Sequence, residues 1–243
     1  MKNISIEATS EVFSAYSGQF FLNQLWKSLK LEKKFKSVLP RKKKKKGLEQ
    51  INKLKALVLS FAVGNDSLSD LDSLNRDKLF QEIIEGNCSS TSMGDFLRSF
   101  DNRHIERFQE ALIEFAIELR FALYPGDRKF ILAMDSTPHK HFGKKMEGLA
   151  FNYKNFWCLD SQNAYDQYGI SYLFDLRPGN IFSGNQSELW VHNIFKRIPK
   201  SCERWFRADS AYSKHEMFRA LQAKEVKFAI VLKDNIGGYV TKL

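Results

Sequence analysis

The chain has 243 residues, of which 43% are hydrophobic, so it can bury the core of one large domain or of two small ones. Its formal net charge is +10, which favours a polyanionic partner such as nucleic acid. No run of residues approaches the roughly 20 apolar residues that span a bilayer, and the first residues lack the apolar segment of a secretion signal. We therefore expect a cytosolic protein without a membrane partner.

The positive charge is concentrated in one segment. Between Lys27 and Lys55 the sequence has 13 Lys or Arg and only two Glu. Its basic run contains no aromatic side chain, so it can neutralise phosphates but cannot read bases. A solvated lysine loop remains the alternative. The candidate DNA contacts in this run are Arg41, Lys42, Lys43, Lys44, Lys45 and Lys46.

Apolar residues recur at helical spacing through the first half of the chain. They predict helices within residues 1–40, 48–63, 67–74 and 79–84, and a long helix that carries the stripe from Ile105 to Leu119. We expect the apolar stripes, including Phe20, Phe21 and Leu25, to face the core. Ser67 and Ser92 are predicted helix caps. Residues 1–124 thus read as an all-helical region, a candidate for DNA binding or dimerisation, bounded by the turn at 124–127.

After this turn the periodicity changes to that of strands. Strands are predicted at 129–134, 155–159, 170–176, 205–208 and 227–232, with helices that begin near Asn185 and Ser213. The first three strands suit an antiparallel meander, and the later strand–helix alternation favours parallel additions to the same sheet. The predicted fold class is α+β with an α/β-like core. The three cysteines, Cys88, Cys158 and Cys202, match no zinc spacing and are expected to be reduced and partly buried.

Two carboxylates follow predicted strands. Asp135 ends the first strand and Asp209 ends the strand at 205–208, 74 positions later. If the two strands are neighbours, both side chains converge at one edge of the sheet and can hold a hard cation such as Mg²⁺. The alternative for each is a bond to loop amides. Arg207 shares the face of Asp209 and can pair with it or with a phosphate.

Further basic residues flank the first carboxylate, and they either hold a substrate backbone or form a solvated basic loop: Lys140, Lys144, Lys145 and Lys154. His139 and His141 lie among them. Because Mg²⁺ prefers oxygen ligands, we expect these histidines to contact phosphate or to be plain loop residues.

Four motifs in order carry a resemblance to a known family: Asp135-Ser136-Thr137, residues 148–154 (Gly-Leu-Ala-Phe-Asn-Tyr-Lys), residues 176–180 (Leu-Arg-Pro-Gly-Asn) and residues 207–212 (Arg-Ala-Asp-Ser-Ala-Tyr). Together they resemble the DDE transposases of bacterial insertion sequences, within the thirteen-eighty group, over residues 48–235. The resemblance implies a ribonuclease-H-like core in which Asp135 and Asp209 are the first two of three acids that bind Mg²⁺ or Mn²⁺.

The same resemblance implies metal-dependent cleavage and strand transfer of DNA. The partners would be transposon ends and target DNA, with no small-molecule substrate, and a homodimer is left open. The location would be the bacterial cytoplasm, in association with the nucleoid.

The third acid of the family, a glutamate in a Tyr-x-x-Arg-x-x-x-Glu pattern, has no counterpart here. The later acids Glu216, Glu225 and Asp234 lack its context. We therefore expect residues 125–243 to be the first part of a catalytic domain without its final helix, and the isolated chain to cleave little DNA. A catalytically inactive DNA-binding remnant that represses transposition is the alternative. A hydrolase with Asp135 as nucleophile is disfavoured, because no second aspartate follows two residues later.

Overall fold

The computed structural model describes residues 14–42, 45–143 and 145–232 and divides the chain into two compact units. The division falls between Ala111 and Leu112, inside helix α7 (Asn102–Leu123). It precedes the turn at 124–127 because the second half of α7 contributes Ile113 and Ala116 to the core of the second unit. No helix in the described part of the chain is long and apolar enough to cross a membrane.

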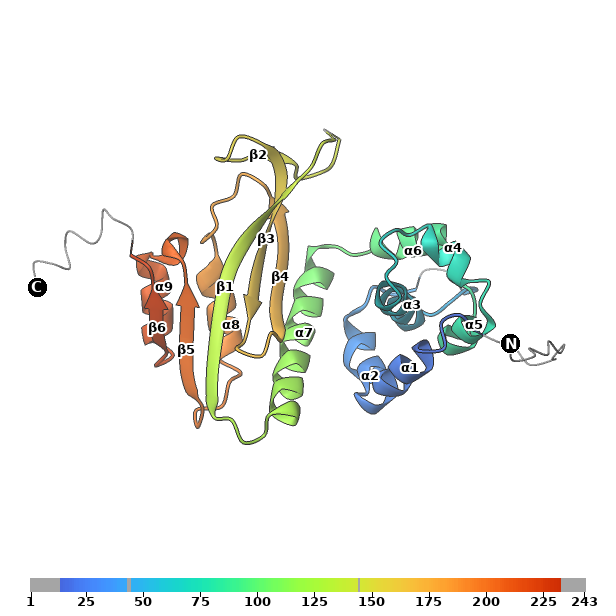
Figure 1. Cartoon of the computed structure of the whole chain (residues 1–243), viewed down its shortest axis with the longest axis horizontal. Coiled ribbons are helices and arrows are strands. Elements are labelled where there is room, and N and C mark those ends of the chain that lie inside the picture. Colours follow the sequence, from blue (N-terminus) through green and yellow to red (C-terminus); the bar gives the residue numbers. More distant parts are fainter. Residues whose placement is uncertain (1–13, 43–44, 144, 233–243) are drawn as a thin grey trace, which may run out of the picture. The chain divides into compact units, whose positions relative to one another are not determined.

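The first unit is helical, as its periodicity predicts (Figure 1). Besides the first half of α7, its elements are α1 (Gln19–Ser28), α2 (Leu31–Phe35), the 3₁₀ helix η1 (Lys36–Val38), α3 (Gln50–Ala62), α4 (Asp70–Leu74), α5 (Lys78–Ile84) and α6 (Ser90–Leu97). The side chain of Asp77 caps α5 by accepting a hydrogen bond of 3.0 Å from the amide of Phe80. Such caps satisfy amides that the helix itself leaves unpaired.

Two details of this unit differ from the sequence prediction. Helix α6 is capped by Ser89, whose Oγ accepts from the amide of Ser92, so Ser92 lies inside the helix and is not its cap. Helix α1 packs against α3 and α5 through Trp26 and neighbouring polar residues, whereas Phe20 and Phe21 are exposed. The prediction that Phe20, Phe21 and Leu25 face the core is therefore wrong.

The long stripe of α7 is also displaced. The helix itself is confirmed, but Ile113, Ala116 and Ile117 are buried, whereas Ile105 is exposed and Leu112 is only partly buried. A shift of one residue turns a helical face by about 100°, so the burial is decided by what packs against the helix and not by apolarity alone.

The second unit contains a mixed sheet and flanking helices. Its strands are β1 (Lys129–Lys140), β2 (Ala150–Phe151), β3 (Trp157–Tyr165), β4 (Ser171–Pro178), β5 (Glu203–Ala208) and β6 (Lys227–Ile230). Its other helices are α8 (Ser187–Phe195), the 3₁₀ helix η2 (Ser210–Tyr212) and α9 (His215–Gln222).

The strands follow the predicted topology. Strands β1, β3 and β4 form an antiparallel meander, and β5 and then β6 add in parallel on the other side of β1, which gives the order β4-β3-β1-β5-β6 (Figure 1). The α+β class with a mixed sheet and flanking helices is confirmed. Strand β1 is longer than predicted, because its pairing with β3 continues through Lys140. Strand β3 begins two residues later than predicted and extends to Tyr165.

One face of the sheet holds the core. Along β1, the side chains of Phe130, Leu132 and Met134 are buried in a cluster with residues of α7, α8, α9 and β5. Burying a large apolar side chain contributes about 1.5–3 kcal/mol, so these alternate residues fix which face of β1 turns inward. Asp135 follows Met134 and therefore lies on the opposite, more exposed face.

The end of α7 is fixed to the sheet by a buried cation. The Arg120 side chain is fully buried, lies 2.7 Å from Asp127 and 3.5 Å from Asp166, and donates to the carbonyl of Lys129. The ring of Tyr168 lies 4.7 Å from its guanidinium. These contacts satisfy a charge that would otherwise be costly to bury.

The caps predicted for the last two helices are wrong. Gln186 precedes α8 without a side-chain hydrogen bond, so Asn185 does not cap it. Helix α9 begins at His215, and the buried hydroxyl of Ser213 has no hydrogen-bond partner. The three cysteines are free and buried, as expected.

Candidate active site on strand β1 and at the end of strand β5

The register of β1 and β5 brings the two predicted carboxylates side by side. The last parallel pair joins Met134 to Ala208, so Asp135 and Asp209 occupy the next position on each strand. Residues in register on parallel strands face the same side of a sheet, and here that side is opposite the apolar core. Both carboxylates line one pocket of about 230 Å³.

Each carboxylate is held by a backbone amide. The amide of Ser136 donates to Oδ1 of Asp135 at 2.7 Å, and the amide of Ala211 donates to Oδ1 of Asp209 at 2.9 Å. Asp209 thereby caps the 3₁₀ helix η2, which fixes its direction. Both side chains are exposed, and within the described residues neither forms an ion pair. Each therefore keeps a carboxylate oxygen for a ligand.

Residues 179–186 pack against both the middle of β1 and the residues that follow β5, which the sequence did not predict. The carbonyl of Ser183 accepts from Arg177 Nη2 at 2.9 Å and from Gln162 Nε2 at 2.8 Å. The hydroxyl of Ser136 donates to that of Ser183 at 2.7 Å, so this segment is tied to the residue that follows Asp135. Arg177 is itself fixed by a buried ion pair of 2.7 Å with Asp160.

Two glycines allow this segment to approach so closely. A Cβ on Gly179 would lie 2.1 Å from the carbonyl oxygen of Cys158, and a Cβ on Gly184 would lie 2.4 Å from that of Ala211. Both contacts are with backbone, which a side-chain rotation cannot relieve. Ala211 donates the hydrogen bond to Asp209, so the segment from 179 to 186 packs against both carboxylate positions.

A buried tyrosine lies beneath the pair. Burial raises the pKa of the Tyr212 phenol, and the charges of Asp135 and Asp209 raise it further. Gln162 lowers this pKa in part, and within the described residues the hydroxyl has no partner in regular hydrogen-bonding geometry. The two carboxylates therefore share one electrostatic environment above a neutral phenol.

The other predicted residues of this unit are spread over a wider area. Lys154 lines the carboxylate pocket, whereas Lys140, Lys145 and Arg207 are exposed and do not. No ion pair joins Arg207 to Asp209 within the described residues. Lys144 lies outside them. His139 is part of β1, not of a loop, and its Nε2 is 2.8 Å from the hydroxyl of Ser161.

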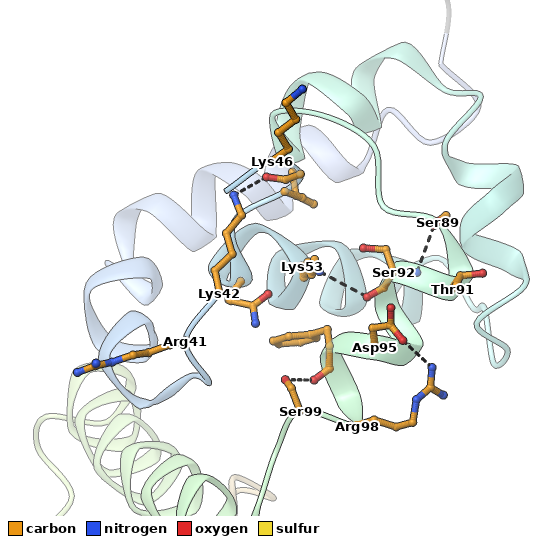
Figure 2. Close-up of a pocket in the computed structure, with 14 residues that line it drawn as sticks. Arg41, Lys42, Lys46, Lys53, Ser89, Thr91, Ser92, Asp95, Arg98 and Ser99 are labelled. Carbon is orange, nitrogen blue, oxygen red and sulfur yellow. Dashed lines mark hydrogen bonds and ion pairs between the residues drawn. The ribbon is translucent and has the colours of Figure 1, made fainter. Parts of the chain in front are cut away.

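The basic run of the first unit contributes to a second pocket, of about 590 Å³ (Figure 2). Arg41, Lys42 and Lys46 line it, Lys45 does not, and Lys43 and Lys44 lie outside the described residues. Lys42 donates to the carbonyl of Gly47 and forms an ion pair of 2.6 Å with Glu49, so its charge is partly compensated.

The structure adds two cations to this second pocket. Lys53 on α3 donates to the carbonyl of Ser92 at 3.5 Å, and Arg98 at the end of α6 lies 3.0 Å from Asp95 (Figure 2). Arg98 is far from the basic run in the sequence, so a local count of charge could not find it. Five cations and one carboxylate line the pocket, which is an arrangement suited to an anion.

The donors at the carboxylate pocket fit a hard divalent cation, because Asp135 and Asp209 offer only oxygen. Within residues 14–42, 45–143 and 145–232, no group of three or more His, Cys, Asp or Glu side chains lies close enough to hold a metal ion. For such a cation the two aspartates would supply only part of the ligand set, and waters would supply the rest.

No curated protein matches the chain. Among solved structures, the Mos1 transposase paired-end complex with the left transposon end is 13% identical, with a TM-score of 0.29, over 90% of this chain and 68% of that one. The piggyBac transposase synaptic complex with hairpin DNA is 14% identical, with a TM-score of 0.42, over 88% of this chain and 51% of that one.

A third similar structure is the simian T-cell lymphotropic virus intasome in complex with a PP2A regulatory subunit, at 13% identity and a TM-score of 0.31, over 72% of this chain and 55% of that one. The assignment does not depend on these low scores. The family model described as "Transposase DDE domain group 1" matches residues 1–237, nearly the whole sequence. The chain therefore belongs to the DDE transposase family.

Proposed function

We propose that this protein acts in DNA transposition of the insertion-sequence type, with Asp135 and Asp209 as two ligands of a catalytic divalent metal. The observation that carries the proposal is the register of β1 and β5, which sets both carboxylates on one face at the rim of one pocket. Membership of the DDE transposase family supports it.

Bound Mg²⁺ or Mn²⁺ would activate the attacking oxygen and stabilise the leaving oxygen of a phosphodiester. The protein's own residues prepare the site. The amides of Ser136 and Ala211 orient the carboxylates. The segment from 179 to 186 contacts the residues that follow each carboxylate, Ser136 and Ala211. Lys154, at the rim, would hold the substrate backbone near them.

Metal binding tests the assignment without requiring turnover. Mn²⁺ added to the protein is expected to bind, as followed by its electron paramagnetic resonance signal, and Asp135→Asn or Asp209→Asn should each weaken binding by at least about tenfold, since each removes one of two charged ligands. Glu203→Gln is the matched control, because Glu203 lies at the opposite end of β5. Equal affinity in all four proteins would refute the assignment.

We further propose that the basic pocket of the first unit grips the DNA backbone. Arg41, Lys46, Lys53 and Arg98 line it together with the partly compensated Lys42. Binding through phosphates predicts that the logarithm of affinity falls with that of salt concentration by about 0.9 per contact. Lys46→Gln and Arg98→Gln should each flatten this slope, whereas Lys78→Gln, an exposed lysine of α5 outside the pocket, should not. An unchanged slope in both pocket variants would refute this role.

A repressor without catalysis is the second candidate. It is favoured because the third carboxylate that lines the pocket, Asp160, is already held in a buried ion pair with Arg177, which leaves Asp135 and Asp209 for a metal. Both functions require DNA binding, and they differ in turnover. If the protein is a transposase, Asp135→Asn should abolish strand cleavage. If it is a repressor, neither the wild type nor Asp135→Asn cleaves DNA, and the substitution should change DNA affinity little. We expect this chain alone to cleave only little DNA.

A further inference from the structure

Strand β2 lies at one end of the sheet (Figure 1), and several aromatic residues in and near this strand are exposed. Phe142 is 88% exposed and Tyr153 is 83% exposed, and Phe151 and Trp157 are about half exposed. The rings of Phe151 and Trp157 pack edge to face, with centroids 5.9 Å apart. Leaving such rings in water forgoes the stabilisation of burial, so this group is a candidate binding surface.

Lysines accompany the two most exposed rings. Lys140 Nζ lies 5.2 Å from the centroid of Phe142, and Lys154 Nζ lies 5.7 Å from that of Tyr153. The surface therefore pairs flat apolar faces with positive charge. A ligand that complements both must have flat rings and negative charge at short spacing, which describes a nucleotide strand.

The turn that presents Tyr153 and Lys154 is held in place. The buried side chain of Asn152 accepts hydrogen bonds from the amides of Lys154 at 3.0 Å and Phe156 at 3.3 Å. The amide of Asn152 donates to the carbonyl of Phe156, which closes the turn from the other side. A ring on such a turn loses less conformational entropy on binding than a ring on a flexible loop.

This surface continues into the carboxylate pocket. Asn152, Tyr153 and Lys154 line the same pocket as Asp135 and Asp209. A strand whose phosphodiester lies at the two carboxylates would thus have its neighbouring nucleotides within reach of the Tyr153 ring. In a duplex the bases are stacked on one another, so only unpaired bases can stack on this ring.

We infer that the rings of Phe142 and Tyr153 stack on unpaired bases of the DNA strand that enters the carboxylate pocket, and that the lysines beside them contact its phosphates. The inference rests on the proposed function, since it takes DNA as the substrate. It also gives a role to the segment from 148 to 154, which the metal site alone leaves unexplained. Stacking of one base on an aromatic ring corresponds to a change of about 5- to 150-fold in affinity.

The test compares two DNA probes of equal charge by fluorescence anisotropy at fixed salt. One is a fully paired duplex, and the other has the same number of nucleotides with a short unpaired end. The wild type is expected to prefer the unpaired end by at least about fivefold. Tyr153→Leu, which keeps an apolar side chain but removes the ring, should abolish this preference and leave duplex affinity unchanged.

Tyr165→Leu is the matched control. Tyr165 is an exposed tyrosine at the opposite end of β3 from Trp157, so its loss should leave the preference intact. Lys154→Gln should weaken the binding of both probes to the same extent, because a phosphate contact does not distinguish paired from unpaired DNA. Both replaced tyrosines are exposed, so all variants should fold.

The outcomes separate this inference from the proposed function. Duplex binding without any preference for the unpaired end, or a preference that survives both Tyr153→Leu and Phe142→Leu, overturns the base-stacking inference alone. Binding of neither probe overturns it together with the proposed DNA partner. Loss of Mn²⁺ binding in Asp135→Asn stays informative about the metal site in either case.

Discussion

Replacing Gly184 by alanine should disturb the carboxylate pair without touching either carboxylate. The added Cβ would lie 2.4 Å from the carbonyl oxygen of Ala211, and ordinary contacts begin at 3.4 Å, so the two groups must separate by 1.0 Å (3.4 − 2.4). Ala211 follows Asp209 by two residues and donates to its carboxylate at 2.9 Å. A shift of that size lengthens the hydrogen bond beyond its useful range.

Two effects follow from this displacement. Overpacking against backbone should lower the free energy of unfolding by about 1–3 kcal/mol. The lost hydrogen bond, at about 0.5–1.5 kcal/mol, releases Asp209 from its fixed direction and should weaken Mn²⁺ binding by up to about tenfold. In a protein that cleaves DNA, a displacement of about 1 Å can lower the rate by about 100-fold.

Urea unfolding and Mn²⁺ titration of the same protein measure both effects. Gly126→Ala is the control, because a Cβ there meets nothing within 4 Å. The reasoning is refuted if Gly184→Ala matches the wild type in both stability and metal affinity. It is also refuted if Gly126→Ala shows the same losses.

Three further predictions concern the second unit, each checked by urea unfolding. Arg120→Leu should destabilise the fold by about 3–5 kcal/mol, because it leaves the fully buried Asp166 carboxylate without its cation; a loss under about 1 kcal/mol would contradict this. The pKa of Asp127 is lowered, first by the hydrogen bond from the amide of Lys129, so its contribution is complete above its usual value of 3.8 and is lost as the pH falls through the folded pKa. Asp127→Asn should therefore destabilise at pH 6 and progressively less as the pH falls below 3.8, and an effect that does not change with pH would count against it. Tyr212→Phe should be neutral or slightly stabilising, since it removes a buried hydroxyl that has no hydrogen-bond partner among the described residues; a loss above about 2 kcal/mol would reveal a hydrogen bond to it.

Sequence patterns predicted the order and pairing of the strands well, since alternation and turn residues reflect the backbone directly. They failed in the middle of β3, where Asp160, Ser161 and Gln162 are polar yet buried. Because the pattern of alternating apolar residues stops at these polar residues, the predicted strand ended too early. Their burial is tolerated because Asp160 pairs with Arg177 and Ser161 with His139, partners that only the folded sheet brings near.

The capping residues were predicted less well than the helices, because several neighbouring residues can each cap the same helix. Ser89 to Ser92 are all capable of capping, and the backbone selects Ser89. The sequence predicted correctly that Asp209 follows the end of its strand, but the prediction that Asp135 ends a strand was wrong, because pairing with β3 extends β1 to Lys140. The role of residues 179–186 could not be read from the sequence, since it depends on distances between backbone atoms of Gly184 and Ala211 that no pattern records.

The two carboxylates join the site across very different lengths of chain. Ala133 pairs with Tyr165 when β1 meets β3, but with Arg207, more than twice as far along the chain, when β1 meets β5. Closing the longer loop costs more chain entropy and requires α8 to cross over first. During folding we therefore expect the hairpin around Asp135 to form early and Asp209 to arrive late, so that a folding intermediate or a nascent chain would present one carboxylate and bind metal poorly. The parallel pairing of β5 with β1 thus couples the appearance of the site to the last stage of folding.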